Sequence, residues 1–265
     1  MPHIFVRGGR SFAPLGMVKS GTFSTTSTSP VVVSGMVANA ALTGSTVTSD
    51  ALVSNVGGPV RIGFSIELTS SGGQTSTVGV YKNGVLVGTA VVDTVAYNGV
   101  TVMFGSVTTT VAVGDAITLR YNQASTAWST TVAATVTRLN ISAGDSVVIG
   151  GTTSADYTPA AGWTDVVFTP TAGTTMSGNA FVVPMAHPNA ILTTVLPVRS
   201  DQAMAARILV NGSVVVTGPN TPAYDLRVRA TTGVAVAAGD LVTVQVQRLS
   251  TFGTTVYAGA KFAIV

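Results

Sequence analysis

The segment TVGVYKNGVLVG, residues 77–88, decides the fold of this chain. Two apolar runs flank Asn83-Gly84, and both residue types tolerate the positive φ angles that a type I′ turn requires. Such a turn joins two antiparallel strands and fixes their register, so Lys82 should lie opposite Val85. The segment therefore predicts a β-hairpin.

The same pattern returns downstream in the segment RILVNGSVVVT, residues 207–217. Here Asn211-Gly212 separates two apolar runs, 128 residues after the first turn. A shorter similarity lies upstream, where ALV at residues 51–53 precedes AFV at residues 180–182 by 129 residues. Features that return in the same order at nearly constant spacing favour a duplicated domain.

A Gly-Asp step follows each hairpin and opens a strand of alternating polarity. Gly114-Asp115 precedes the first of these strands, and Gly239-Asp240 precedes the second, 125 residues later. An aspartate in such a turn can accept hydrogen bonds from nearby backbone N–H groups. We therefore interpret both aspartates as structural turn residues rather than as a pair of catalytic carboxylates.

The composition favours β structure throughout. Only 9% of the residues are charged and Glu67 is the single glutamate, whereas Val, Thr, Ser, Ala and Gly dominate. Val and Thr favour strands, and the chain is poor in the Glu and Lys that helices use. A surface with so few charges suits a protein that works inside an assembly.

The strand pattern predicts an all-β fold of two tandem antiparallel β-sandwiches of jelly-roll-like form. Short apolar segments separated by turn residues are typical of sandwiches and barrels. A Gly-rich stretch that begins at Gly144 marks the joint. We place an extended arm at residues 1–16, the first sandwich at 17–140 and the second at 141–265.

The predicted arm combines apolar and cationic side chains in a segment rich in Gly and Pro. Its candidate assembly residues are Ile4, Phe5, Val6, Arg7, Arg10 and Phe12. One interpretation is a frayed terminus. The other is an arm that docks on a neighbouring subunit, where its apolar side chains would be buried.

No catalytic or cofactor constellation is apparent in the sequence. The chain has no cysteine, and neither His3 nor His187 has a partner at metal-binding spacing. A calcium site is a further alternative, although no Asp-x-Asp pattern supports it. Trp128 and Trp163 could stack on a sugar, but without an acidic cluster beside them packing in a core or an interface is favoured. We expect no enzyme activity, no cofactor and no metal site.

Other partner classes are also disfavoured. The net charge of +3 comes from scattered residues, and no basic run with interleaved aromatics suggests nucleic acid. No segment has the length of an apolar membrane span, and the first ten residues lack the apolar core of a secretion signal. We therefore expect synthesis in a cytoplasm.

The hairpin followed by the Gly-Asp strand resembles the globular-head jelly rolls of the complement and tumour necrosis factor superfamily. The matching stretches are VYKNGV at residues 80–85 and VGDAITL at residues 113–119. Related jelly rolls are common in bacteriophage tail and head appendages, and the composition is similar to that of actinobacteriophage minor tail proteins. The chain lacks the dense aromatic core of the animal domains. The resemblance implies a homo-oligomer, which in that superfamily is a trimer.

These observations together predict a non-enzymatic structural protein of a phage virion, with a minor tail protein as the favoured role. Its partners would be other virion proteins and further copies of itself, on the surface of the tail or head. A capsid decoration protein is one alternative. A carbohydrate-binding or host-adhesion module of the tail, with a host-surface glycan as ligand, is the other.

Overall fold

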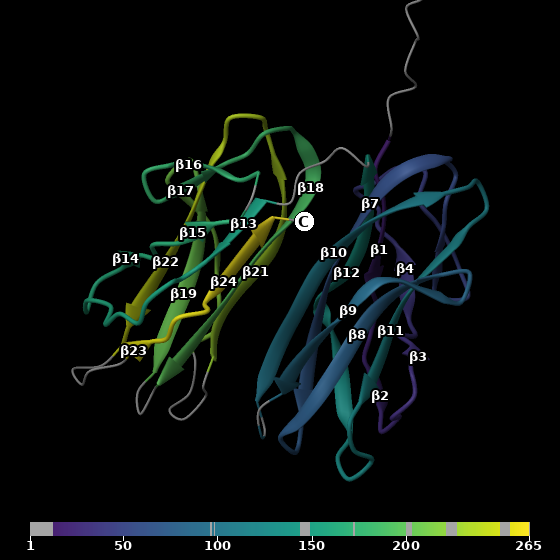
Figure 1. Ribbon diagram of the computed structural model, residues 1–265, viewed down its shortest axis with the longest axis horizontal. Coiled ribbons are helices and arrows are strands. Elements are labelled where there is room, and N and C mark those ends of the chain that lie inside the picture. Colours follow the sequence, from purple (N-terminus) through teal and green to yellow (C-terminus); the bar gives the residue numbers. More distant parts are fainter. Residues whose placement is uncertain are drawn as a thin grey trace, which may run out of the picture.

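The computed structural model describes residues 13–95, 97, 99–143, 149–171, 173–199, 203–220, 227–249 and 255–264. Within these ranges the chain forms strands and turns but no helix, which confirms the predicted all-β class. The strands form four antiparallel sheets of six strands each, arranged as β-sandwiches (Figure 1). None of the described segments is a helix long and apolar enough to cross a membrane.

The first two sheets use the strands between Leu15 and Ala143. These are β1 (Leu15–Lys19), β2 (Phe23–Thr25), β3 (Val31–Val32), β4 (Met36–Ala38), β5 (Thr46–Thr48), β6 (Ala51–Val53), β7 (Gly58–Ser70), β8 (Gln74–Lys82), β9 (Val85–Val95), β10 (Val100–Val111), β11 (Ala116–Gln123) and β12 (Thr130–Ala143). One sheet has the order β10-β7-β12-β1-β4, with β2 beside β12. The other has the order β5-β6-β11-β8-β9, with β3 beside β11.

The other two sheets use the strands between Ile149 and Ile264. These are β13 (Ile149–Thr152), β14 (Thr164–Asp165), β15 (Thr169–Pro170), β16 (Thr175–Ser177), β17 (Ala180–Val182), β18 (His187–Arg199), β19 (Met204–Val210), β20 (Ser213–Thr217), β21 (Arg227–Val236), β22 (Leu241–Arg248), β23 (Thr255–Val256) and β24 (Lys261–Ile264). Their orders are β15-β13-β24-β18-β21, with β23 beside β18, and β16-β17-β22-β19-β20, with β14 beside β22.

The two halves have the same strand order along the main path of each sheet. Reading each sheet in order, β10-β7-β12-β1-β4 corresponds to β21-β18-β24-β13-β15, and β5-β6-β11-β8-β9 corresponds to β16-β17-β22-β19-β20. The long strand β12 changes register between Ala133 and Arg138, and in the second half its place is taken by the two strands β23 and β24. From β6 to β12 successive strands alternate between the paired sheets except at the hairpin β8–β9, as in jelly rolls.

Each sandwich has its own hydrophobic core, filled by the alternate side chains that face inward. In the first half, Ile117, Leu119 and Tyr121 of β11 are fully buried. In the second half, the core contains three aromatic rings, and the ring centroid of Phe181 lies 5.4 Å from that of Phe168 and 4.6 Å from that of Phe262. The alternation of β11 predicted which of its side chains point inward.

The structure corrects two predicted boundaries. The first sandwich does not end at residue 140, because β12 continues to Ala143, and Ile141 pairs with Leu15. The arm does not extend to residue 16, because β1 begins at Leu15, which is fully buried. The Gly and Pro residues at this end of the chain interrupt the apolar pattern, so the sequence does not show where this strand begins. The candidate arm residues Ile4, Phe5, Val6, Arg7, Arg10 and Phe12 lie outside the described residues.

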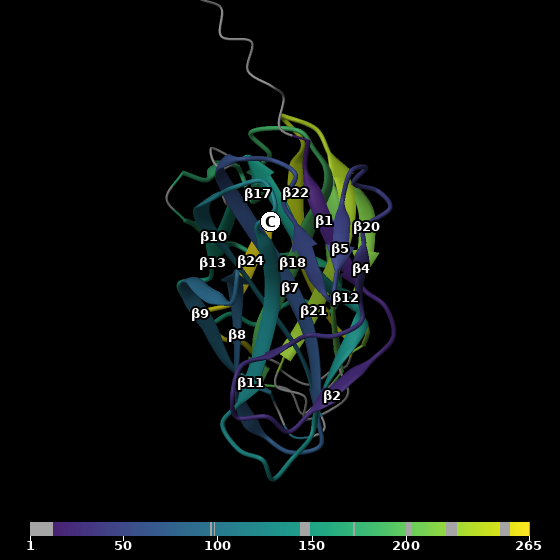
Figure 2. The ribbon, with the colours of Figure 1, turned by 90° about the vertical axis from the view of Figure 1, so that its right-hand side faces the viewer.

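The two sandwiches stack face to face, so that the molecule has four sheet layers (Figures 1 and 2). We call the sheets that contain β7 and β18 the inner sheets, because β10 and β12 of one face β21 and β24 of the other (Figure 1). A small cluster of three buried valines, Val102, Val136 and Val195, lies between the inner sheets, with Phe104 packed against it. We call this contact region the sandwich joint.

Candidate functional site

The Asn-Gly hairpin has the geometry that its sequence predicts. Lys82 lies opposite Val85, and Tyr81 lies opposite Leu86. Asn83 has a φ of 50° and Gly84 a φ of 84°, as a type I′ turn requires. In the second hairpin, Asn211 and Gly212 have φ angles of 51° and 78°.

The Asn-Gly turn and the Gly-Asp turn of one sandwich meet in space, and hydrogen bonds join them. Asn83 Nδ2 donates to Asp115 Oδ1 over 2.7 Å, and the amide N–H of Ala116 donates to Asn83 Oδ1 over 2.8 Å. The amide N–H of Ala112 donates to Asp115 Oδ2 over 2.8 Å. We call this set of bonds the turn clamp.

The second sandwich repeats the turn clamp bond for bond. Asn211 Nδ2 donates to Asp240 Oδ1 over 2.8 Å, and the amide of Leu241 donates to Asn211 Oδ1 over 2.9 Å. The amide of Ala237 donates to Asp240 Oδ2 over 2.7 Å. The repeated motifs are therefore halves of one structural device, which ties the tip of a hairpin to the start of the neighbouring strand.

The electrostatics of the turn clamp suit a structural role. The hydrogen bond from the Ala112 amide, followed by that from Asn83, lowers the pKa of Asp115 below its ordinary value. The Ala237 amide and then Asn211 lower the pKa of Asp240 in the same way. Both aspartates are therefore ionised acceptors at neutral pH, and a general acid would need a raised pKa instead.

Replacing Gly84 with valine should lower the melting temperature clearly more than replacing the exposed Ser71 with valine. A β-branched residue is strongly disfavoured at a φ of 84°, whereas Ser71 has no positive φ. Differential scanning calorimetry of both variants would measure the difference. Equal shifts would show that the turn does not depend on glycine.

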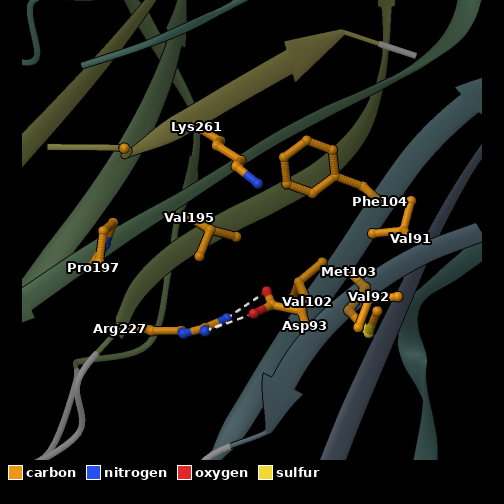
Figure 3. Close-up of a pocket in the computed structure, with 11 residues that line it drawn as sticks. Val91, Val92, Asp93, Val102, Met103, Phe104, Val195, Pro197, Arg227 and Lys261 are labelled. Carbon is orange, nitrogen blue, oxygen red and sulfur yellow. Dashed lines mark hydrogen bonds and ion pairs between the residues drawn. The ribbon is translucent and has the colours of Figure 1, made fainter. Parts of the chain in front are cut away.

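The sandwich joint contains a paired charge. Arg227 Nη1 and Nη2 donate to the two carboxylate oxygens of Asp93 over 2.5 and 2.7 Å, which joins β21 of the second sandwich to β9 of the first (Figure 3). The pair lines a cavity of about 150 Å³ between the sandwiches. Burial by itself raises the pKa of Asp93, but the hydrogen bonds and charge of Arg227 outweigh it and the pKa is lowered. The Lys261 amino group points toward the ring of Phe104 across the same cavity (Figure 3).

A second arginine reinforces the joint. Arg229 is nearly buried, and its Nη1 donates to the backbone carbonyl of Val100 in the first sandwich. Burial raises the pKa of Glu67, while the charge of Arg229 acts in the opposite direction. Glu67 and Arg229 both line a second and larger cavity of the joint, with a volume of about 490 Å³. The charges that meet between the sandwiches therefore bind one half of the chain to the other.

The remaining candidates do not assemble into a catalytic or metal-binding centre. His3 lies outside the described residues, and burial lowers the pKa of His187, which lines a small apolar cavity of the joint. Within the described ranges, no three His, Asp or Glu side chains are grouped so that they could hold a metal ion. Trp128 is 46% exposed, so it is not packed in the core, and packing at an interface stays a prediction. Trp163 lies under the guanidinium of Arg207, 4.2 Å from the ring centroid.

Comparisons with known proteins give little further information. No family model matches the chain. No curated protein matches it either. Among solved structures it is similar to the insecticidal delta-endotoxin Cry8Ea1 from Bacillus thuringiensis, with 9% identity and a TM-score of 0.24. That alignment covers 97% of this chain and 54% of the toxin, so the chain spans about half the length of the toxin, and a likeness this low carries no argument.

Proposed function

We propose that this chain is a non-enzymatic structural protein of a bacteriophage virion, with a minor tail protein as the favoured role. The observation that carries the assembly part of the proposal is the edge strand β9. It ends the outer sheet of the first sandwich, and near the hairpin it leaves Val85 70% and Leu86 40% exposed, whereas Val92 and Asp93 farther along β9 line the cavity of the joint. A long edge strand with exposed apolar side chains favours pairing with a neighbouring subunit.

The partners of the charged side chains support the same role. The aspartates of the repeated motifs are bonded within the turn clamps, and Asp93 and Arg227 join the two sandwiches. A four-layer body with few charged residues suits a building block of a particle. The virion itself is inferred from the composition and from the resemblance of the paired motifs to jelly rolls of phage appendages, and the jelly-roll strand order supports that resemblance.

The test is to replace Val85 and Leu86 together with glutamate in the phage that encodes the chain. If β9 is an assembly edge, the variant should enter particles at about a tenth of the wild-type copy number or less, since charges in the middle of an interface cost about 1–3 kcal/mol each. Quantitative mass spectrometry of purified virions measures the copy number. The melting temperature of the isolated chain should stay nearly unchanged, because both side chains are exposed.

Val167→Glu is the matched control, because Val167 is 64% exposed in the second sandwich, away from β9. It should enter particles at the wild-type copy number. Deletion of residues 2–12, which leaves β1 intact, separately tests whether the N-terminal arm docks. Absence of the wild-type chain from purified virions would overturn the proposed function, and equal incorporation of the β9 variant and the control would overturn β9 as the assembly edge.

A further inference from the structure

The geometry points to a binding site for a neutral saccharide at one end of the first sandwich, with Trp128 as its stacking platform. The site lies between the β7–β8 turn and the β11–β12 loop, which is the teal loop at the lower end of the right-hand sandwich in Figure 1. The inference does not rest on the virion role, because the isolated chain would carry the site.

One face of the Trp128 ring is covered and the other is open. A Cβ atom added to Gly72 would lie 2.3–2.4 Å from three atoms of the Trp128 pyrrole ring, Cγ, Cδ1 and Cδ2. These nearly equal distances place Gly72 over the ring face rather than at the ring edge. Because Trp128 is nevertheless 46% exposed, the opposite face is available to a ligand. An exposed indole face supported from behind by backbone is suited to stacking.

Buried hydrogen bonds hold the Trp128 loop in place. The side-chain amide of Gln123 donates to the backbone carbonyls of Ser125 and Trp128, each over 2.6 Å. Gln123 is itself 1% exposed, and its Oε1 accepts a hydrogen bond from Gln74 Nε2 over 3.1 Å. These bonds fix the backbone of the loop that carries the indole, which reduces the entropy that is lost when a ligand binds.

A groove lined by hydroxyl groups lies at the same end of the sandwich, formed by residues that neighbour Gly72 and Trp128 in the chain. It has a volume of about 350 Å³, and its lining residues are Thr69, Ser70, Ser71, Ser129 and Thr131. Ser129 follows Trp128 in the chain, and Ser71 precedes Gly72. The volume lies within the range of small-molecule sites, about 300–1,000 Å³.

The chemistry of the groove selects the class of ligand. Serine and threonine hydroxyls both donate and accept hydrogen bonds, as sugar hydroxyls do. The apolar C–H face of a pyranose ring can lie on the indole while its hydroxyls reach the groove. Among the residues that the structure describes, no lysine or arginine lines the groove to neutralise a phosphate, so a nucleotide or an anionic polysaccharide fits less well.

The test uses the full chain with Trp163→Phe, so that Trp128 is the single tryptophan and its fluorescence reports the site. Maltohexaose, cellohexaose, mannohexaose and chitohexaose are the probes, each titrated to about 10 mM, the upper range of weak single-site binding. We expect a saturable change in the emission of Trp128 with at least one of them. No saturable change with any of the four would overturn the inference.

The variants are tested by calorimetry with the hexasaccharide that binds. Trp128→Ala should lower the affinity about tenfold or more, through the loss of the stacking platform. Gly72→Ala should also weaken binding, because its added methyl group must displace the indole, and Ser71→Val should weaken it by removing a groove hydroxyl. Circular dichroism and melting temperature check that each variant is folded. Folded variants that bind as tightly as the parent, or tighter binding of a sulfated or phosphorylated hexasaccharide, would contradict the assignment.

Discussion

Replacing Phe181 with alanine should lower the melting temperature of the second sandwich by about 10–20 °C, because the change is expected to cost about 3–5 kcal/mol. Phe181 is fully buried and stacks on Phe262 with 4.6 Å between the ring centroids. Its removal leaves a cavity at the centre of the aromatic cluster, where neighbouring rings relax only in part. Differential scanning calorimetry would measure the shift.

The matched control for this variant is Leu52→Ala. Leu52 occupies the place of Phe181 in the first sandwich, since both follow an alanine at the start of equivalent strands and pair with equivalent partners, Ile117 and Val242. Because each half has a separate core, the control should destabilise the first sandwich and leave the second nearly unchanged. A single transition that both variants lower equally would show that the halves unfold as one cooperative unit.

Replacing Arg227 with leucine should reduce the free energy that holds the two sandwiches together by about 1–3 kcal/mol. This cost is lower than for a fully buried ion pair, because both side chains keep some contact with water. The variant leaves the Asp93 carboxylate half-buried without its bidentate partner. Small-angle X-ray scattering should then show a larger maximum dimension and a broader distance distribution. Each sandwich should keep its own melting transition, since the pair lies outside both cores.

The control is Arg120→Leu, which removes an arginine from the outer sheet of the first sandwich, where it lies 4.7 Å from the centroid of the Tyr81 ring. Its scattering curve should match that of the parent. A double-mutant cycle with Asp93→Leu would isolate the coupling between Arg227 and Asp93. Identical scattering of the Arg227 variant and the parent would show that the valine cluster and the Arg229 bond hold the joint without the Asp93 pair.

Acid provides an independent way to break the same pair. The folded pKa of Asp93 is lowered, so the stability that its charge contributes is fully present above the ordinary pKa of an aspartate, about 4, and is lost as the pH falls through the lower folded value. The scattering curve should therefore be the same at pH 7 and pH 5 and change only in more acidic solution. An opening near pH 6 would point to a histidine instead.

Local patterns predicted much of the fold, since the signals lie within short segments. The Asn-Gly pair predicted the hairpin register, the alternation of β11 predicted its buried face, and the spacing of the motifs predicted two halves with one topology. The start of β1 could not be predicted, because Pro14 and Gly16 interrupt the apolar pattern and Leu15 becomes strand only by pairing with Ile141. A partner so distant in the sequence leaves no local signal.

The contacts that position the candidate sites were beyond the reach of sequence patterns for the same reason. The motifs of the turn clamp were both recognised, but nothing in their sequence shows that Asn83 reaches Asp115. Asp93 and Arg227 belong to different halves and occur at positions that the duplication does not repeat. The absence of an acidic cluster favours a core or an interface for Trp128, and its 46% exposure excludes the core alone.

The turn clamp has a consequence for the order of folding. A hairpin closes locally within microseconds, but Asn83 and Asp115 are 32 residues apart and Asn211 and Asp240 are 29 residues apart. Each clamp closes only when a hairpin tip meets the start of β11 or β22, so we expect its bonds to form after the rate-limiting step. Interactions absent from the transition state slow unfolding without changing the folding rate. The two clamps should therefore lower the unfolding rate and so prolong the lifetime of the native state.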